Sequence, residues 1–509
     1  MEYLLGIDLG TSSVRAALVT ADGRVAGIAG QEYPLLTPYP DWAEQDPEAW
    51  WQATAGVIRR VIVAAGIQPQ ALKAIGLSGQ MHGLVLLDRD GRVIRPAIIW
   101  PDKRSRAECL AIAAQIAPDR LYDITGLPTM TGFFGVSLLW VKNHEPQHYR
   151  QIHAALLPKD FIRYRLTGEL ATDVTDGSGT LLFDVRRRHW SAEIIDALEL
   201  SPDYLPTPLE SASPAGRVTQ TAAEVTGLAT ATPVIAGGGD QLMGAIGAGI
   251  TRPGMVASTI GTGGQVFTTA RQAVFDPGRR IHTLCHALPN AWFLMGAILS
   301  AGLSLRWFKE NLCELENLAG SVANTDVYEI LSRSAATVEP GAQGLIFLPY
   351  LCGERTPYMD PNAKGCFIGL SLAHHKPHLV RAIMEGVSFA LKDSLAIFAE
   401  LGIPVQTVIC SGGAARSEVW SQIQADIYET PVAILAQQEH SVYGAALLAG
   451  IAGGIFKDGA DLEQLQRPVQ RQFVPNPEHT ALYRRHYAIY RSLYPSLKEA
   501  YAKLAAVER

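Results

Sequence analysis

A strand–turn–strand unit occurs twice in this chain, with the two copies about 250 residues apart. In the first copy the apolar residues 3–8 and 14–20 flank a glycine turn, and in the second copy residues 255–260 and 265–270 do the same. Alignment places Leu9-Gly10-Thr11-Ser12 over Ile260-Gly261-Thr262-Gly263, which predicts two related domains. Asp8 corresponds to Thr259, so only one copy keeps the carboxylate. That asymmetry suits a single active site between two halves.

The segments around both copies alternate between strand and helix patterns. Residues 24–29 and 74–78 are strand-like, and between them Asp46-Pro47 opens a helix, with Asp46 as N-cap and Pro47 in the first helical position. After the second copy, an apolar strand over 405–410 leads through a glycine turn into a helix over 416–428. Such alternation is typical of layered α/β domains.

Three segments are expected from this pattern: 1–249, 250–455 and 456–509. No proline- or serine-rich linker separates the first two, so a broad interface with a hinge is expected between them. The last segment carries tyrosines at helical spacing from about residue 479. We interpret it as an amphipathic helix that packs back on the body, rather than as an aromatic ligand site.

The charge balance excludes nucleic-acid binding as the main activity. There are 43 Lys plus Arg against 49 Asp plus Glu, a net charge of −6, which offers no attraction for a phosphate backbone. The six cysteines occur singly, without a Cys-x-x-Cys pair, and predict reduced thiols in a cytoplasmic chain. The N-terminus lacks the basic region and the long apolar run of a signal peptide.

One stretch, residues 231–250, is nearly uncharged and long enough to span a membrane. Asp240 and Gln241 lie near its middle, and three glycines precede them. A charged group at the centre of a span is costly in lipid, so a membrane span is rejected here.

Three glycine-rich turns follow apolar strands, at residues 10–13, 261–264 and 412–414. Such turns allow backbone N–H groups to approach a phosphate closely, and hydroxyl groups add donors. None of the three matches the Walker or Rossmann glycine patterns, and each alone could be a simple hairpin. Three in one chain, two of them in equivalent repeat positions, favour a phosphate or nucleotide cleft.

Asp240 is the strongest candidate for catalysis. An apolar strand over 234–236 ends in Gly237-Gly238-Gly239, and Asp240 then stands before a helix over 242–248. An aspartate in this place could merely cap the helix. A cap does not need three glycines, whereas a base that acts on a bulky ligand needs an approachable carboxylate, so we favour the base. Asp8, beside a phosphate-type turn, is suited to hold Mg²⁺ through water.

The segment Ser78-Gly79-Gln80-Met81-His82-Gly83 ends another strand. A lone histidine is usually structural, but His82 beside Met81 at a strand end is placed to touch a polyol. His282, Cys285 and His286 have no further ligand at usable spacing, so no metal is expected there.

With these motifs in place, the sequence resembles the FGGY family of carbohydrate kinases over essentially its whole length. The resemblance rests on motifs along the entire chain: residues 7–12, 42–47, 78–83, 237–240, 348–350, 353–357, 365–370, 378–385, and 412–414 with Ser417. Within the family, the segment 78–83 is similar to the sugar-binding segment of the pentulose branch.

The resemblance implies a fold of the actin–hexokinase, or ribonuclease H-like, type: two α/β domains around a central cleft, with sugar toward 1–249 and nucleotide toward 250–455. The implied reaction is the transfer of phosphate from ATP to D-xylulose, giving D-xylulose 5-phosphate in xylose catabolism, with Asp240 as base and Mg²⁺ near Asp8. The implied sugar-binding residues are Met81, His82, Trp100, Asp102, Asp240 and Gln241. The implied nucleotide-binding residues are Gly10, Thr11, Ser12, Gly261, Thr262, Gly412, Gly413, Ala414 and Ser417.

Some positions depart from the family pattern and leave the exact sugar open. They are Pro101, Ser137, Gln241 and the segment Gly263-Gly264-Gln265. A kinase for another pentulose, such as ribulose, or for another polyol is the alternative within the class. Outside it stands a non-catalytic actin-like ATP switch, which would have no reason to keep Met81, His82 and Asp240. The oligomeric state stays open, with a homodimer as one option.

Overall fold

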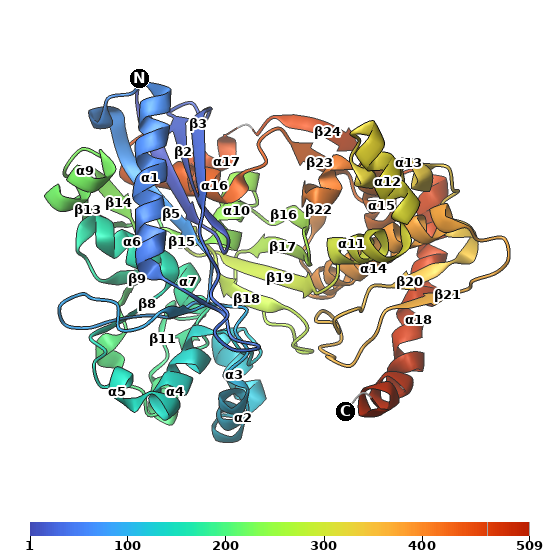
Figure 1. The fold of residues 1–509 in the computed structure, drawn as a ribbon, viewed down its shortest axis with the longest axis horizontal. Coiled ribbons are helices and arrows are strands. Elements are labelled where there is room, and N and C mark those ends of the chain that lie inside the picture. The colour runs from blue at the N-terminus through green and yellow to red at the C-terminus, as the bar shows by residue number, and fades with distance from the viewer. Residues whose placement is uncertain (466, 508–509) are drawn as a thin grey trace.

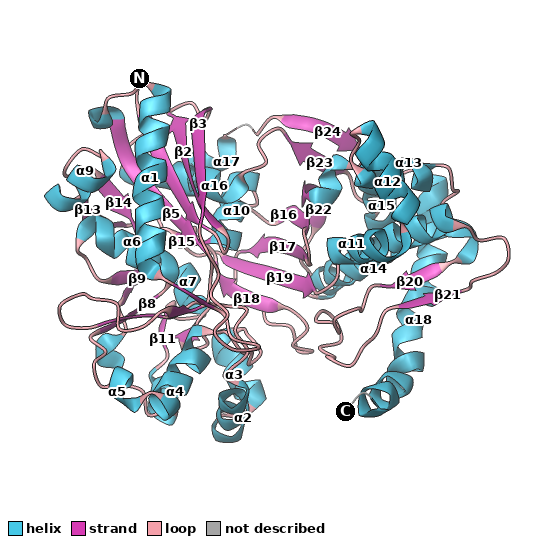
Figure 2. Ribbon diagram, viewed as in Figure 1, coloured by secondary structure: helices cyan, strands magenta, loops and turns pink. Residues whose placement is uncertain are grey.

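The computed structural model describes residues 1–465 and 467–507. Two seven-stranded mixed sheets form the centres of two halves, and helices cover the faces of both sheets (Figure 1, Figure 2). The N-terminal half of the chain forms one half of the molecule, and most of the later residues form the other. Layered α/β architecture is confirmed.

The first sheet has the strand order β13-β14-β5-β1-β2-β3, and β15 also pairs with β5. These strands are β1 (Tyr3–Leu9), β2 (Ser13–Thr20), β3 (Val25–Glu32), β5 (Leu72–Gly79), β13 (Pro214–Arg217), β14 (Pro233–Ile235) and β15 (Gly238–Gly239). Helix α1 (Pro47–Ala65) packs on β2 and β3. As predicted, Asp46 caps α1, because its side chain accepts a hydrogen bond from the N–H of Glu48, and Pro47 follows it.

The second sheet repeats the core of the first. Its order is β18-β19-β17-β16-β22-β23-β24, with β16 (Gly254–Ile260), β17 (Gly264–Ala270), β18 (His282–Cys285), β19 (Trp292–Ile298), β22 (Val405–Gly412), β23 (Val432–Leu435) and β24 (Val469–Phe473). Strand β1 pairs antiparallel with β2 and parallel with β5, and β16 pairs in the same way with β17 and β22. The predicted internal repeat is confirmed.

Helix α16 (His440–Ala452) comes late in the chain but packs on β1 and β5 of the first sheet. The approach needs glycine in both strands. A Cβ atom at Gly6 would lie 2.0 Å from the carbonyl oxygen of Val442, and one at Gly76 would lie 1.9 Å from that of Ala445. Segment 250–455 therefore contributes a helix to the opposite half.

The remaining elements connect and cover the sheets. In the first half they are β4 (Glu44–Gln45), η1 (Pro69–Ala71), β6 (Val85–Leu87), β7 (Ala97–Ile98), α2 (Arg106–Gln115), α3 (Pro118–Thr125), α4 (Phe134–His144), α5 (Pro146–Tyr149), β8 (Ala154–Leu156), α6 (Pro158–Thr167), β9 (Ala171–Asp173), α7 (Val174–Ser178), β10 (Phe183–Asp184), β11 (His189–Trp190), α8 (Ala192–Ala197), η2 (Pro202–Tyr204), β12 (Thr207–Leu209), α9 (Gln220–Thr226) and α10 (Asp240–Ala248). In the second half they are α11 (Gly302–Leu312), α12 (Glu314–Ala323), α13 (Val327–Ala336), η3 (Ala342–Gly344), β20 (Ile346–Leu348), β21 (Cys366–Ile368), α14 (Lys376–Glu400), η4 (Gly413–Arg416), α15 (Glu418–Tyr428) and α18 (Pro477–Val507). Helix α17 (Gly459–Gln464) contacts α16 and lies beside it (Figure 1).

The long helix α18 confirms the interpretation of the tyrosine-rich tail. Tyr483 and Tyr490 are buried, the hydroxyl of Tyr483 donates to Glu385 at 2.7 Å, and the hydroxyls of Tyr490 and Tyr350 lie 2.8 Å apart. The tail segment is not helical throughout, since β24 joins the edge of the second sheet beside β23. The middle three residues of this short edge strand are polar and only its two end residues are apolar, so the sequence pattern did not reveal it.

The stretch 231–250 folds into β14, β15 and the nine-residue helix α10. Within residues 1–465 and 467–507, no helix combines the length and apolar character that a membrane span needs.

Candidate active site

The carboxyl ends of three parallel strands bring two aspartates to one edge of the first sheet. Asp8 in β1 and Gly238 in β15 both lie opposite Ser78 in the central strand β5. Neighbouring strands are about 4.8 Å apart, so Asp8 lies about two strand spacings from the chain that leads into Asp240. The position follows from topology, because parallel strands end on the same side of a sheet.

Asp8 is half-buried, and the hydroxyl of Ser78 donates a hydrogen bond to its carboxylate at 2.6 Å. Burial raises the pKa of Asp8, and the Ser78 hydrogen bond and the Arg15 charge partly offset that rise. The result is a carboxylate that is supported on one side and open to a cationic partner.

Asp240 is the first residue of α10. The N-cap residue is Gly239, so no N-cap side chain accepts a hydrogen bond at the start of this helix. The carboxylate of Asp240 accepts a hydrogen bond from the N–H of Gln241 at 2.7 Å. Burial and the nearby charge of Asp8 raise the pKa of Asp240 to about 7. A carboxyl group with this pKa is suited to take a proton near neutral pH.

The three glycines before Asp240 have a steric role that sequence reasoning missed. Gly237 has a φ of +77°, and a Cβ atom there would lie 2.3 Å from the carbonyl oxygen of Leu77. A Cβ at Gly239 would lie 2.7 Å from Cγ of Met81. The glycines therefore allow this chain to pass tightly against β5 and Met81, and are not there only to expose the carboxylate.

His82 is held in an unusual conformation directly after β5. Its φ is +72°, its ring stacks on Phe133 with centroids 4.3 Å apart, and Nδ1 lies 2.6 Å from the carbonyl oxygen of Gly179. A carbonyl oxygen only accepts, so Nδ1 carries the proton and Nε2 is left as an acceptor. Burial and, more weakly, the charge of Arg355 lower the pKa of His82 to about 4, and the ring is neutral. Its free nitrogen can accept a hydrogen bond from a hydroxyl.

A hydrogen-bond chain joins this strand end to the first glycine turn. The side chain of Gln80 donates to Gln45 at 2.9 Å, and Gln45 donates to the carbonyl oxygen of Thr11 at 2.7 Å. Trp100, 46% exposed, donates from Nε1 to the hydroxyl of Thr11 at 2.9 Å. Trp100 thus lies beside the turn 10–13. The sequence analysis did not predict that Gln45 links Gln80 to this turn, because only its place in the motif 42–47 marks it.

Asp102 does not fit the predicted contact with the sugar. It is 1% exposed, and its carboxylate accepts hydrogen bonds from the N–H of Ala43 at 2.7 Å and from the guanidinium of Arg104 at 2.8 Å. Because both oxygens are used within the protein, the structure gives Asp102 the role of holding the loop after Trp100.

A cavity of about 820 Å³ lies in the second half. The predicted residues Gly261, Thr262, Gly413, Ala414 and Ser417 all line it. Helices α11 and α13 supply further lining residues that the sequence did not single out, among them Arg306, Tyr328, Ser332 and Arg333. These come from segments far apart in the chain, and no local pattern marks them.

Gly412 and the turn 10–12 lie outside this lining. Gly412 has a φ of +83°, and a Cβ there would lie 2.4 Å from the carbonyl oxygen of Ile260, so it supports the cavity floor from behind.

Ser417 caps α15 by accepting from the N–H of Trp420 at 3.1 Å, and its hydroxyl lies 2.6 Å from that of Ser332. Gly10, Thr11 and Ser12 lie at the end of β1 beside Asp8, with Ser12 exposed.

Behind Asp240 lies a fully buried ionic cluster that sequence analysis also missed. Its members are Lys159, Asp160, Arg163, Asp173 and Asp176. The hydroxyl of Thr175 donates to Asp173 at 2.6 Å and accepts from the N–H of Gly239 at 3.0 Å. The cluster therefore fixes the backbone that carries Asp240.

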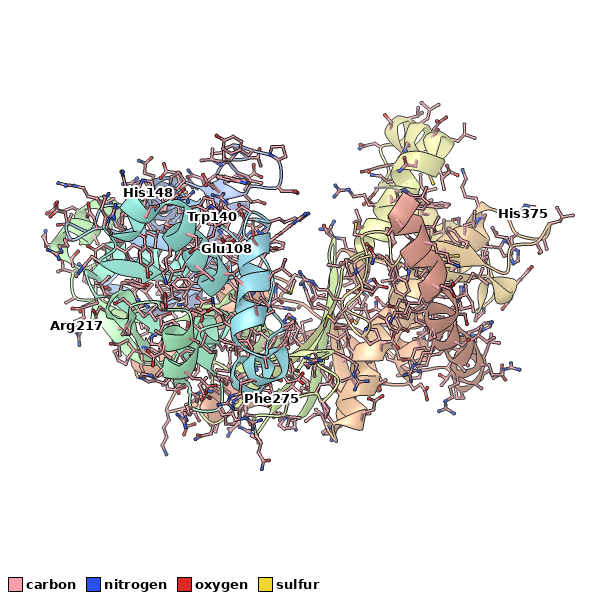
Figure 3. All side chains as sticks on the ribbon, turned by 90° about the horizontal axis from the view of Figure 1, so that it is seen from below. Glu108, Trp140, His148, Arg217, Phe275 and His375 are labelled. Atoms are coloured by element: carbon pink, nitrogen blue, oxygen red, sulfur yellow. The ribbon has the colours of Figure 1, made fainter. Side chains whose placement is uncertain are left out.

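The two halves meet around the second-sheet strand β18 (Figure 1). Figure 3 shows Phe275 where they join, with Trp140 on one side and His375 far out on the other. The ring of Phe275 contacts Tyr122 edge-on at 6.0 Å, and Arg186 lies 4.0 Å above it.

This is the architecture of a two-domain carbohydrate kinase, with the acidic strand ends in one half and the glycine-lined cavity in the other. Residues 3–247 match the N-terminal domain of the FGGY family of carbohydrate kinases, and residues 256–453 match its C-terminal domain. The chain belongs to the FGGY family of carbohydrate kinases.

Similar proteins match over nearly their full length. The xylulose kinase of Escherichia coli K12 is 40% identical over 97% of this chain and 99% of its own. The xylulose kinase of Bacillus subtilis 168 is 37% identical over 98% of each chain. The crystal structure of xylulose kinase from Rhodospirillum rubrum aligns with a TM-score of 0.91 at 31% identity, covering 98% of this chain and all of the other.

Proposed function

We propose that this protein transfers the γ-phosphoryl group of ATP to the terminal hydroxyl of D-xylulose, giving D-xylulose 5-phosphate and ADP. The observation that carries the proposal is Asp240, a carboxyl group with a pKa of about 7 at a strand end, next to Met81 and the neutral His82. The substrate is favoured by the xylulose kinases that match along the whole chain.

Asp240 acts as the general base. Its carboxylate takes the proton of the sugar hydroxyl while the hydroxyl oxygen forms a bond to the γ-phosphorus, and the bond from that phosphorus to the β,γ-bridging oxygen breaks to release ADP. His82 accepts a hydrogen bond from another sugar hydroxyl through Nε2. Met81 and Gln241 are the further sugar contacts, and Trp100, hydrogen-bonded to Thr11, is the third.

The charged oxygens are held by backbone donors at two turns. The donors are the N–H groups of Thr11 and Ser12 after β1 and of Thr262 after the equivalent strand β16. The N–H groups of Gly10 and Gly261 close these turns instead, by donating to the carbonyl oxygens of Ser13 at 3.0 Å and Gly263 at 2.9 Å. Because the reaction needs little covalent chemistry from the protein, positioning and charge stabilisation carry most of the catalysis. The adenosine end of ATP occupies the cavity beside Gly413, Ala414 and Ser417, with Gly412 as support.

Mg²⁺ fits the donors at the acidic strand ends. Asp8 presents carboxylate oxygens there, and Mg²⁺ favours one or two carboxylates together with phosphate oxygens and water. Within the described part of the chain no cluster of three or more acidic, histidine or cysteine side chains forms a separate metal cage. Asp8 would hold the ion, which when bound supplies positive charge to the phosphate oxygens.

A coupled assay of ADP release tests the proposal over D-xylulose, D-ribulose, L-ribulose, gluconate and glycerol. D-xylulose is expected to give the highest kcat/KM, and Asp240→Asn to remove the activity while the fold is kept. A higher kcat/KM for another sugar would replace the substrate and leave the kinase chemistry in place. No sugar-dependent ADP release with any of them would overturn the proposal and favour the actin-like switch.

A further inference from the structure

Arg355 belongs to the motif 353–357, which the proposed mechanism leaves without a role. The residue is half-buried, and burial lowers the pKa of its guanidinium. Among residues 1–465 and 467–507, no carboxylate lies within ion-pair distance of that guanidinium, and no protein acceptor takes a hydrogen bond from it. An unpaired cation in a partly desolvated place is costly unless a ligand supplies acceptors.

The backbone around Arg355 is fixed firmly to the second sheet. Glu354, 2% exposed, accepts from the N–H of Leu299 at 3.1 Å and from that of Arg355 at 2.7 Å. The hydroxyl of Thr356 accepts from the N–H of Ala297 at 3.1 Å and donates to the carbonyl oxygen of Arg280 at 2.7 Å. Arg355 is therefore held at the end of β19, and its place does not depend on a loose loop.

The same attachment brings Arg355 to the sugar side of the interface. Residue His282 in β18 lies opposite Met295 in β19, two residues from Ala297. The other end of β18 contacts the first half, since the N–H of Cys285 donates to the hydroxyl of Ser178 at 3.2 Å. The next residue along, Gly179, holds the ring of His82.

The electrostatics agree with this placement. Burial and then the charge of Arg355 lower the pKa of His282 to about 3, and Arg355 also lowers the pKa of His82. Asp8, and not Arg355, is the charge that affects Asp240. Together with the contact of β18 to Ser178 and the hydrogen bond of Gly179 to His82, this places Arg355 on the His82 side of the site rather than beside Asp240.

We propose that Arg355 contacts the bound sugar and donates hydrogen bonds to a hydroxyl or carbonyl oxygen at the end of the molecule remote from Asp240. This inference rests on the proposed function of the site. It makes Arg355 the residue of the second half that binds the sugar. A planar guanidinium carries several donors in fixed directions, so it distinguishes sugars by where their oxygens lie.

Arg355→Met tests the contact, with Arg485→Met on the exposed face of α18 as the matched control. Loss of a charged hydrogen bond is expected to raise the KM for D-xylulose about tenfold or more, with the KM for ATP changed less than about twofold. Calorimetric titration with D-xylulose alone should show the same loss of affinity. Arg355→Lys should retain only part of the wild-type affinity, because lysine keeps the positive charge but lacks the planar guanidinium with its several donors.

A comparison of D-xylulose with xylitol separates the two acceptors. If the carbonyl is the acceptor, Arg355→Met lowers the preference for the ketose. If hydroxyl groups are the acceptors, D-xylulose and xylitol lose affinity equally. An unchanged KM for sugar in a folded Arg355→Met protein overturns the inference, and so does an equal rise in the KM for ATP. Either result leaves the proposed function intact, whereas a wild-type protein that fails to phosphorylate D-xylulose rejects that function first.

Discussion

Thr259 occupies in the second sheet the position that Asp8 occupies in the first. Asp8 lies opposite Ser78 in the neighbouring parallel strand, and Thr259 lies opposite Ser411 in the same register. Both pairs are hydrogen-bonded, at 2.6 Å from Ser78 to Asp8 and at 2.8 Å between the hydroxyls of Thr259 and Ser411. The duplication has kept the hydrogen bond at both strand ends and the negative charge at only one, which assigns the catalytic edge to the first half.

That charge predicts a pH effect. Asp8 raises the pKa of Asp240, so Asp8→Asn should lower it and move the acidic limb of the kcat/KM profile to lower pH, because a base works in its deprotonated form. The profile is measured with D-xylulose at saturating ATP. Thr259→Ala, at the equivalent position but without a charge to lose, should leave the limb in place. Because Mg²⁺ at Asp8 offsets this charge during turnover, the pKa of Asp240 is also measured without nucleotide and metal, from the pH dependence of unfolding. A pKa that is the same in Asp8→Asn and in the wild type would show that the two carboxylates are not coupled.

His82 gives a prediction about substrate affinity. Its pKa of about 4 keeps the ring neutral, with Nε2 as acceptor, throughout the physiological range. The KM for sugar should therefore show no inflection near the ordinary histidine pKa of about 6.5, and His82→Ala should raise that KM much more than the KM for ATP. Steady-state kinetics over pH check both points. An inflection that disappears in His82→Ala would mean that the ring titrates at its ordinary pKa.

Two adjacent glycines distinguish a ligand effect from a folding effect. A Cβ at Gly413 meets only the carbonyl oxygen of Ile260 at 4.0 Å, whereas one at Gly412 would lie 2.4 Å from that atom in a backbone with φ of +83°. Gly413→Val should raise the KM for ATP and leave titration with sugar alone unchanged. Gly412→Val should lower the melting temperature instead. Loss of sugar binding in a stable Gly413→Val protein would contradict the assignment of this turn to the nucleotide.

The sequence predicted the parts of this molecule whose signals are local. The repeat, the cap of α1 by Asp46 and the placement of Asp240 at a strand end all follow from short patterns of apolar residues, glycine and proline. The edge strand β24 was missed because an edge strand needs no strong alternation. The inward orientation of Asp102 was missed because its partners, Ala43 and Arg104, reveal themselves only once the loop is folded.

Long-range packing explains the remaining differences. The glycines before Asp240 are required by contacts with Leu77 and Met81, residues far away in the sequence. The acidic residues of the ionic cluster around Lys159 come from three elements, α6, β9 and α7. Helix α16, late in the chain, packs on the first sheet. None of these relationships has a period or spacing that a single sequence could display.

Thr175 tests whether that cluster positions the base. Thr175→Val removes the hydroxyl that joins Asp173 to the N–H of Gly239, so the backbone before Asp240 loses its anchor. A small displacement of a catalytic group is costly, and kcat should fall about tenfold to a hundredfold with little change in the KM for sugar. Thr175→Ser keeps the hydroxyl and should retain most of the activity. Equal losses in both variants would indicate a packing role.

Asp240→Asn should separate catalysis from stability in one protein. Asparagine is no base, so turnover should fall by about 10²–10⁴-fold while D-xylulose still binds. The same change should stabilise the fold at alkaline pH. The pKa of Asp240 is about 7 in the folded protein and 3.8 ordinarily, so between those values the folded state binds more protons than the unfolded state and wild-type stability falls as pH rises.

The free energy of unfolding of Asp240→Asn should therefore equal that of the wild type below about pH 4 and exceed it increasingly up to about pH 7, with a constant difference above. Denaturant titrations across this range measure the difference, and Asp196→Asn on the solvent-exposed face of α8 provides a control that should show no such gain. A variant that is less stable than the wild type at every pH would mean that Asp240 serves the helix. A well-folded variant with wild-type turnover would remove Asp240 from the mechanism.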